Sequence, residues 1–134
     1  MKLAQAYAQS QNITLSGETA FEELYTRLAR WTREAEENSN RGETATFEAL
    51  VEKCLSVLGY MDQCIDVSNN YDTATRILSL HRFAIGGLVR SKAERNAAPL
   101  SGIPQVFVSL AEIFAAIRST QEGGNKPQET RRNA

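Results

Sequence analysis

Four segments of the chain place apolar residues at three-and-four spacing, and no segment shows the strict alternation that is typical of a half-buried strand. The second of them, residues 43–65, has the most regular pattern. Its apolar residues are Phe47, Leu50, Val51, Cys54, Leu58, Met61 and Ile65. Because this repeat matches the 3.6-residue turn of a helix, the sequence predicts an all-α protein.

Short polar connections separate the other three predicted helices. The first follows Ser16, a residue type that often caps a helix, and ends in the polar run ENSNRG. The third spans about residues 71–94. The fourth has Pro104 in its first turn, where the amide hydrogen that proline lacks has no helical partner. Four helices joined in this way predict an antiparallel four-helix bundle over residues 16–119.

The two ends of the chain have few apolar residues. We expect residues 1–15 to form a short N-terminal cap segment. Residues 120–134 contain no large apolar side chain. Because such a stretch cannot offset the entropy cost of ordering, we predict a flexible C-terminal tail there. With 134 residues, the chain is the size of one domain.

The net charge and the hydropathy of the chain argue against two classes of partner, nucleic acids and membranes. The chain has 15 basic and 16 acidic residues and a formal net charge of -1. A nucleic-acid-binding protein usually concentrates Lys and Arg on one face, so we expect no nucleic acid partner. We find no signal peptide pattern and no apolar run near the roughly 20 residues of a membrane span. The sequence therefore predicts a cytoplasmic protein without membrane insertion.

The common catalytic and metal-binding motifs are absent from the sequence. It contains no GxxxxGK[ST], GxGxxG or GxSxG, so we expect neither an enzyme nor a bound cofactor. Cys54 and Cys64 are ten residues apart in one predicted helix, too far to form a disulfide. Without a CxxC or HxxxH spacing they do not form a metal site. We predict that both are reduced and buried.

His81 is the only histidine in the chain, and it could be a phosphoacceptor or a residue that packs in the core or lines a groove. Histidine phosphotransfer domains are also four-helix bundles with a histidine on a helix. They typically have Lys and Gly three and four residues later, whereas this chain has Ala84 and Ile85. His81 shares a helix face with Ile77 and Leu88, whereas a phosphoacceptor must face water. A histidine that packs in the core or lines a groove is favoured.

Several stretches resemble the flagellin-specific export chaperone family FliS. They are AYAQSQNIT, SGETAFEELYTRLARWTREA and IDVSNNYDTATRILSLHRFAIGGLVRSK. By this resemblance, His81 takes the place of a family tyrosine, which also favours packing. The chain departs from the family pattern at Gly17, at Glu22 and Glu23, and at the pair Gly86 and Gly87. Glycines inside a helix suggest either a tolerated local weakness or close approach by another backbone, from the fourth helix or from a bound peptide.

The resemblance implies a cytosolic chaperone that binds the C-terminal segment of flagellin, prevents its premature polymerisation and delivers it to the flagellar type III export apparatus. A component of the export gate is a further expected partner. The residues expected by resemblance to bind flagellin are Tyr7, Ile13, Tyr25, Leu28, Ile77, His81, Ile85 and Leu88. Two alternatives stay open: a histidine phosphotransfer-like signalling module, and a self-associating structural bundle that forms a homodimer.

Overall fold

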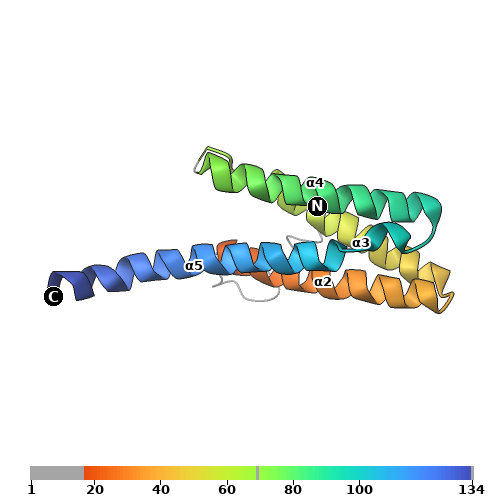
Figure 1. Cartoon of the computed structure of the whole chain (residues 1–134), viewed down its shortest axis with the longest axis horizontal. Coiled ribbons are helices and arrows are strands. Elements are labelled where there is room, and N and C mark those ends of the chain that lie inside the picture. Colours follow the sequence, from red (N-terminus) through yellow and green to blue (C-terminus); the bar gives the residue numbers. More distant parts are fainter. Residues whose placement is uncertain (1–16, 69, 134) are drawn as a thin grey trace.

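The computed structural model describes residues 17–68 and 70–133, with side chains up to Thr120. The helices within these ranges are α2 (Gly17–Asn40), α3 (Thr44–Gln63), α4 (Tyr71–Glu94), the short 3-10 helix η1 (Ala98–Leu100) and α5 (Ile103–Asn133). Consecutive α-helices run antiparallel, with α2 beside α5 and α3 beside α4 (Figure 1). No strand occurs in the described ranges. The predicted all-α, antiparallel four-helix bundle is therefore confirmed.

Local sequence signals explain where the helices begin and end. The chain leaves α2 through Gly42, whose φ of 77° lies in the left-handed region that favours glycine. The side chain of Asn70 accepts a hydrogen bond from the amide of Thr73, 3.2 Å away, and caps α4. Helix α4 has the predicted limits, whereas α3 is shorter than the predicted 43–65 by one residue at its start and two at its end.

The connection between α4 and α5 contains a structured element that the sequence did not predict. Here η1 forms one turn, and its Leu100 is buried in the core. Helix α5 then begins at Ile103, so Pro104 lies in its first turn as predicted.

The core is a continuous cluster to which all four α-helices and η1 contribute. Its largest fully buried side chains are Tyr25, Phe47, Phe107, Leu28, Leu58, Met61, Leu88, Leu100, Ile103, Leu110, His81 and Val51. Both cysteines are free, and Cys54 is buried as predicted. The prediction that Cys64 is buried is wrong: Cys64 follows the last residue of α3 and is exposed, because the apolar face ends with the helix.

One prediction about apolar stretches also needs correction. Residues Ala98–Thr120 have the length and apolar composition of a membrane span, with a mean hydropathy of 1.7. The same stretch supplies Ile103, Phe107 and Leu110 to the core. The core helix of a soluble protein has the same composition, so this stretch is weak evidence for a membrane span.

The structure describes the backbone of the predicted C-terminal tail up to residue 133, but not the predicted N-terminal cap segment. Residues 1–15, including Tyr7 and Ile13, lie outside the described residues. Helix α5 continues to Asn133, through the segment predicted to be a tail. The boundary at residue 120 and the flexibility of the segment beyond it stay predictions.

Candidate functional site: the α4 side of the bundle

His81 lies at the centre of a polar network that joins three helices. The side chain is fully buried, and its Nε2 lies 2.7 Å from the hydroxyl of Tyr25 on α2. Its Nδ1 lies 3.0 Å from Oδ1 of Asp62 on α3, and the other Asp62 oxygen accepts from Arg82, also at 3.0 Å. Tyr25, His81, Asp62 and Arg82 are called the His81 network below.

The hydrogen-bonding partners determine which ring nitrogen of His81 carries the proton. A carboxylate can only accept, so Nδ1 is the donor to Asp62. In the neutral ring Nε2 then has a free lone pair and accepts from the Tyr25 hydroxyl. Burial lowers the pKa of His81, although the neighbouring Asp62 raises it in part. Burial also raises the pKa of Tyr25, which keeps this hydroxyl protonated.

This geometry fits a structural histidine better than a phosphoacceptor. Both ring nitrogens already have partners, and the side chain has no exposed surface. A phosphoacceptor nitrogen must reach a phosphoryl donor from solvent. The packing interpretation of His81 is therefore confirmed.

Ion pairs connect one edge of α4 to α3. Arg82 pairs with Asp62, Lys92 with Glu52, and the C-cap residue Arg95 with Glu48. Within residues 17–68 and 70–120, every ion pair made by α4 or its C-cap reaches α3. The edge of α4 nearer to α5 therefore depends on apolar packing.

Of the two adjacent glycines in α4, Gly86 and Gly87, only one lies close to the backbone of a neighbouring element. A Cβ added to Gly87 would lie 2.8 Å from the carbonyl oxygen of Pro99 and 2.9 Å from Cδ1 of Ile103. A Cβ at Gly86 would have no atom within 4 Å. The predicted close approach is therefore confirmed for Gly87, where η1 and the start of α5 meet α4, and not for Gly86.

Two rows of apolar side chains extend from this contact. Leu80 and Phe83 lie seven and four residues before Gly87, on the same side of α4. On α5, Val106, Ile113 and Ile117 follow Ile103 at three-and-four spacing and are half-buried. The two helices diverge from η1 toward the first turn of α4 (Figure 1).

These two rows, Leu80, Phe83, Val106, Ile113 and Ile117, are called the α4–α5 face below. Phe83 is its most accessible member, with 59 % of its surface exposed. An isolated exposed apolar residue is ordinary on a protein surface, whereas a row at helical spacing beside a second row fits an amphipathic helix of a partner. This face is the candidate functional site.

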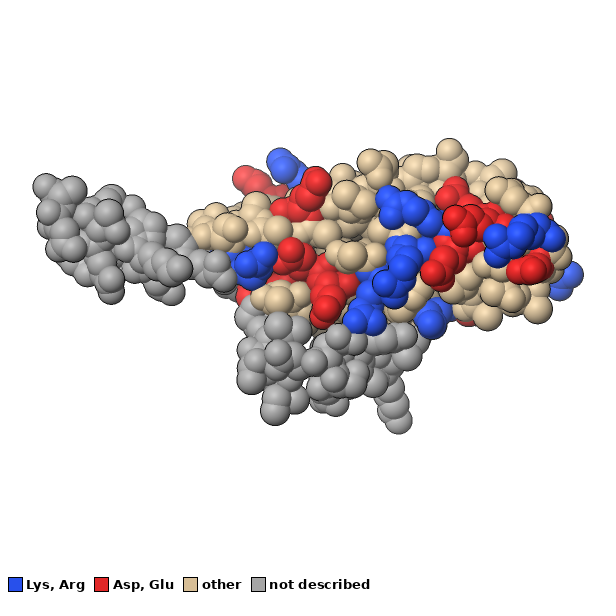
Figure 2. Space-filling model, turned by 90° about the horizontal axis from the view of Figure 1, so that it is seen from below, with Lys and Arg blue, Asp and Glu red and all other residues tan. Residues whose placement is uncertain are grey.

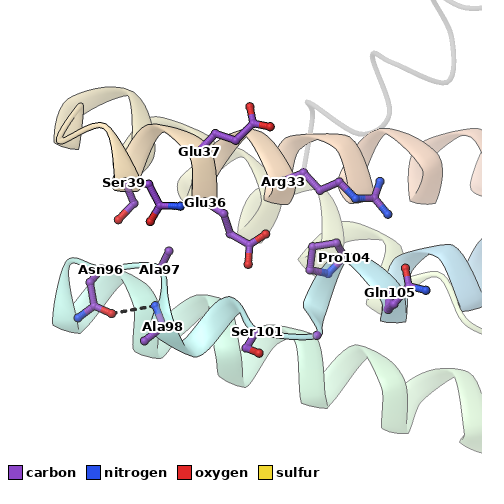
Figure 3. Close-up of a pocket in the computed structure, with 12 residues that line it drawn as sticks. Arg33, Glu36, Glu37, Ser39, Asn96, Ala97, Ala98, Ser101, Pro104 and Gln105 are labelled. Carbon is purple, nitrogen blue, oxygen red and sulfur yellow. Dashed lines mark hydrogen bonds between the residues drawn. The ribbon is translucent and has the colours of Figure 1, made fainter.

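A depression of about 880 Å³ lies at the opposite end of the molecule from the first turn of α4. It lies between the end of α2 and the connection from Asn96 to Gln105 (Figure 3). Glu36 points from α2 toward that connection, and burial raises the pKa of its carboxyl. The lining side chains are polar or small apart from Pro104. The depression therefore lacks the large apolar side chains that a helix-binding surface uses.

Charged side chains are mixed in sign on the face shown in Figure 2. Acidic and basic groups interleave there, so this face carries no extended basic patch. Among the described residues, no group of three His, Cys, Asp or Glu side chains is placed to hold a metal ion.

The structure places most of the sequence-predicted site residues in the core. Five of them are buried: Tyr25, Leu28, Ile77, His81 and Leu88. Ile85 is half-buried, and Tyr7 and Ile13 lie outside the described residues. Direct contact of any of these eight residues with flagellin stays a prediction.

Two residues important for this side of the molecule were not among the predicted site residues. Asp62 pairs with His81 from 19 residues away, and no local pattern indicates that pairing. Phe83, in contrast, can be noticed in the sequence. It is an aromatic residue next to Arg82, and it falls outside the buried stripe of α4.

Comparison with known families agrees with this fold and with the sequence resemblance. No curated protein matches the chain. The family model described as "Flagellar protein FliS" matches residues 1–121 of the 134. The match spans α2, α3, α4, η1 and most of α5, and therefore includes both rows of the α4–α5 face. The chain belongs to the FliS family of flagellar export chaperones.

Proposed function

We propose that this protein binds the C-terminal segment of flagellin in the cytoplasm, prevents premature polymerisation and delivers the flagellin to the type III export apparatus. The observation that carries the proposal is the α4–α5 face, on a bundle that belongs to the FliS family. An export chaperone needs a surface that accepts an unfolded client and later releases it. A partly exposed apolar face suits that task better than a closed pocket does.

The proposed binding mode is an amphipathic helix of the client laid between the two rows. Phe83 and Leu80 on α4 and Val106 on α5 would bury their remaining apolar surface against it. The free energy gained from this apolar burial must exceed the entropy cost that a disordered segment incurs when it folds on its partner. Several apolar contacts along a helix are therefore needed, and the rows on α4 and α5 provide them.

In the proposed binding mode, several of the sequence-predicted residues hold the α4–α5 face in position. Ile77, His81 and Leu88 lie on the inner side of α4, and fix the position from which Leu80 and Phe83 project. The proposal also retains the N-terminal segment with Tyr7 and Ile13 as a cover for part of the face in the absence of client. A component of the export gate is the proposed second partner.

The same face also fits a homodimer, and one experiment separates the two functions. Light scattering after size exclusion gives the mass of the chain alone and with the C-terminal segment of flagellin from the same organism. A monomer that forms a one-to-one complex supports the chaperone. A dimer whose mass does not change with the client supports a self-associating bundle instead.

A further inference from the structure

The His81 network is the only polar connection of the first half of α4 to its neighbours in the described residues. The ion pairs of Lys92 and Arg95 lie at the far end of α4, near η1. Between Tyr71 and Leu80 the buried side chains are Ala74 and Ile77 alone. This half of α4 is thus attached by the buried Ala74 and Ile77, by the partly buried Leu80, and by the contacts of His81 and Arg82.

The neutral and protonated forms of His81 do not fit this network equally well. In the neutral form each ring nitrogen has the partner it requires: Asp62 accepts from Nδ1, and the Tyr25 hydroxyl donates to Nε2. Protonation makes Nε2 a donor, so the Tyr25 hydroxyl must turn its hydrogen away. Tyr25 is fully buried, and its hydroxyl has no other hydrogen-bond partner among the described side chains. A buried hydroxyl hydrogen without an acceptor is costly.

Each helix packed around His81 contributes one group that faces the ring or its partners. Helix α3 contributes Asp62, which favours the protonated ring, and α4 itself contributes Arg82, which opposes it. Helix α2 contributes the uncharged Tyr25. From α5 the uncharged ring of Phe114 packs against Tyr25, at 5.3 Å between centroids. The carboxylate of Asp62 is shared with Arg82, so it compensates a charge on His81 only in part.

We propose that His81 is a pH-sensitive latch: the neutral ring holds the first half of α4 on α2 and α3, and protonation releases it. Release would move Leu80, which belongs to the α4–α5 face, and the first turns of α4 that precede it. The latch is a property of the free chain, and it does not depend on which client binds.

The direction of the pH effect follows from the environment of the ring. Burial lowers the pKa of His81 in the folded chain relative to the unfolded chain. The unfolded chain therefore binds more protons just below its own histidine pKa of about 6.5, and stability falls as the pH drops through that range. The contribution of His81 to stability is fully present only above it.

The single histidine makes the test direct, because the imidazole signals in a nuclear magnetic resonance spectrum of the untagged chain belong to His81 alone. The titration midpoint in the folded chain is expected to lie below the midpoint in the urea-unfolded chain. Amide protection factors for residues 71–80 are expected to be lost over the same pH range. A midpoint at or above the unfolded value would overturn the proposal, and so would a lowered midpoint without loss of protection.

Three variants make the test specific to the latch. His81→Gln keeps a donor and an acceptor but cannot titrate, and its residues 71–80 should keep their protection through this pH range. Asp62→Asn should shift the His81 midpoint further down, because the carboxylate favours the protonated ring. Glu52→Gln breaks the ion pair at the other end of α4 and should leave the midpoint unchanged. Equal loss of protection in wild type and His81→Gln would contradict the latch.

Discussion

The hydroxyl of Tyr25 on α2 lies 2.7 Å from Nε2 of His81 on α4, across 56 residues of sequence and inside the core. The two rings also pack together, with centroids 5.7 Å apart. This contact explains why a histidine is tolerated at a fully buried position. The flat ring fills the place that the family resemblance gives to an aromatic, and both of its nitrogens are paired.

Removing the hydroxyl of Tyr25 should destabilise the fold. Tyr25→Phe keeps the ring but leaves Nε2 of His81 without a donor. An unsatisfied buried acceptor costs about 1–3 kcal/mol, so we expect the free energy of unfolding to fall by that amount in urea titrations. Tyr71→Phe, at a tyrosine outside the network that is 69 % exposed, is the control and should change stability by less than about 0.5 kcal/mol. Equal effects of the two variants would argue against the network.

The adjacent glycines of α4 should respond in opposite ways to the same substitution. Gly87→Ala places a methyl group against the Pro99 carbonyl and Ile103, and overpacking of this kind costs about 1–3 kcal/mol. Gly86→Ala meets no atom within 4 Å. Because alanine favours a helix interior over glycine by up to about 1 kcal/mol, Gly86→Ala should be stabilising. Chemical denaturation of both variants gives the comparison, and a stabilised Gly87→Ala would show that α4 is not held close to η1.

The two thiols should differ in reactivity in the folded protein. Cys64 is exposed, whereas Cys54 is buried, and burial raises the pKa of the Cys54 thiol to about 12. Because the thiolate is the reactive form, a thiol reagent at neutral pH should modify Cys64 quickly and Cys54 only as the chain unfolds. Cys64→Ser should abolish the fast phase. Fast modification of both thiols would show that the core around Cys54 opens readily.

Much of the fold could be predicted because helical periodicity is a local property. The limits of α4 followed from its apolar spacing and its flanking polar residues. The turn η1 could not be found in this way, because three residues around Pro99 show no period. The prediction for Cys64 is wrong because it extends the apolar pattern of α3 past the end of the helix.

The candidate site was harder to predict than the fold, for a physical reason. Apolar spacing identifies the side of a helix that avoids water, and it does not distinguish a core from a binding face. The family resemblance implies Tyr25, Leu28 and Leu88 as binding residues, and apolar spacing alone cannot show that they fill the core. The sequence shows that Phe83 falls outside the buried stripe of α4, but its position on the side toward α5 follows only from the contacts of Gly87 with Ile103 and of Arg82 with Asp62.

The α4–α5 face is best tested by a pair of substitutions on one helix. Phe83 lies on the side of α4 that carries Gly87, whereas Val89 lies two turns after Arg82, on the side that pairs with α3. Both are at least half exposed, at 59 % and 50 %, so a serine at either position should leave the fold intact. The substitutions differ mainly in which side of α4 loses an apolar side chain.

The measurement is calorimetric titration of the wild type, Phe83→Ser and Val89→Ser with the C-terminal segment of flagellin from the same organism. The wild type should bind one to one with a negative heat-capacity change, the mark of apolar burial. Loss of the Phe83 ring should weaken binding by about 1–2 kcal/mol, or roughly 5- to 30-fold, with little change for Val89→Ser. No binding by the wild type, or equal weakening by both substitutions, would contradict the assignment of the α4–α5 face to flagellin.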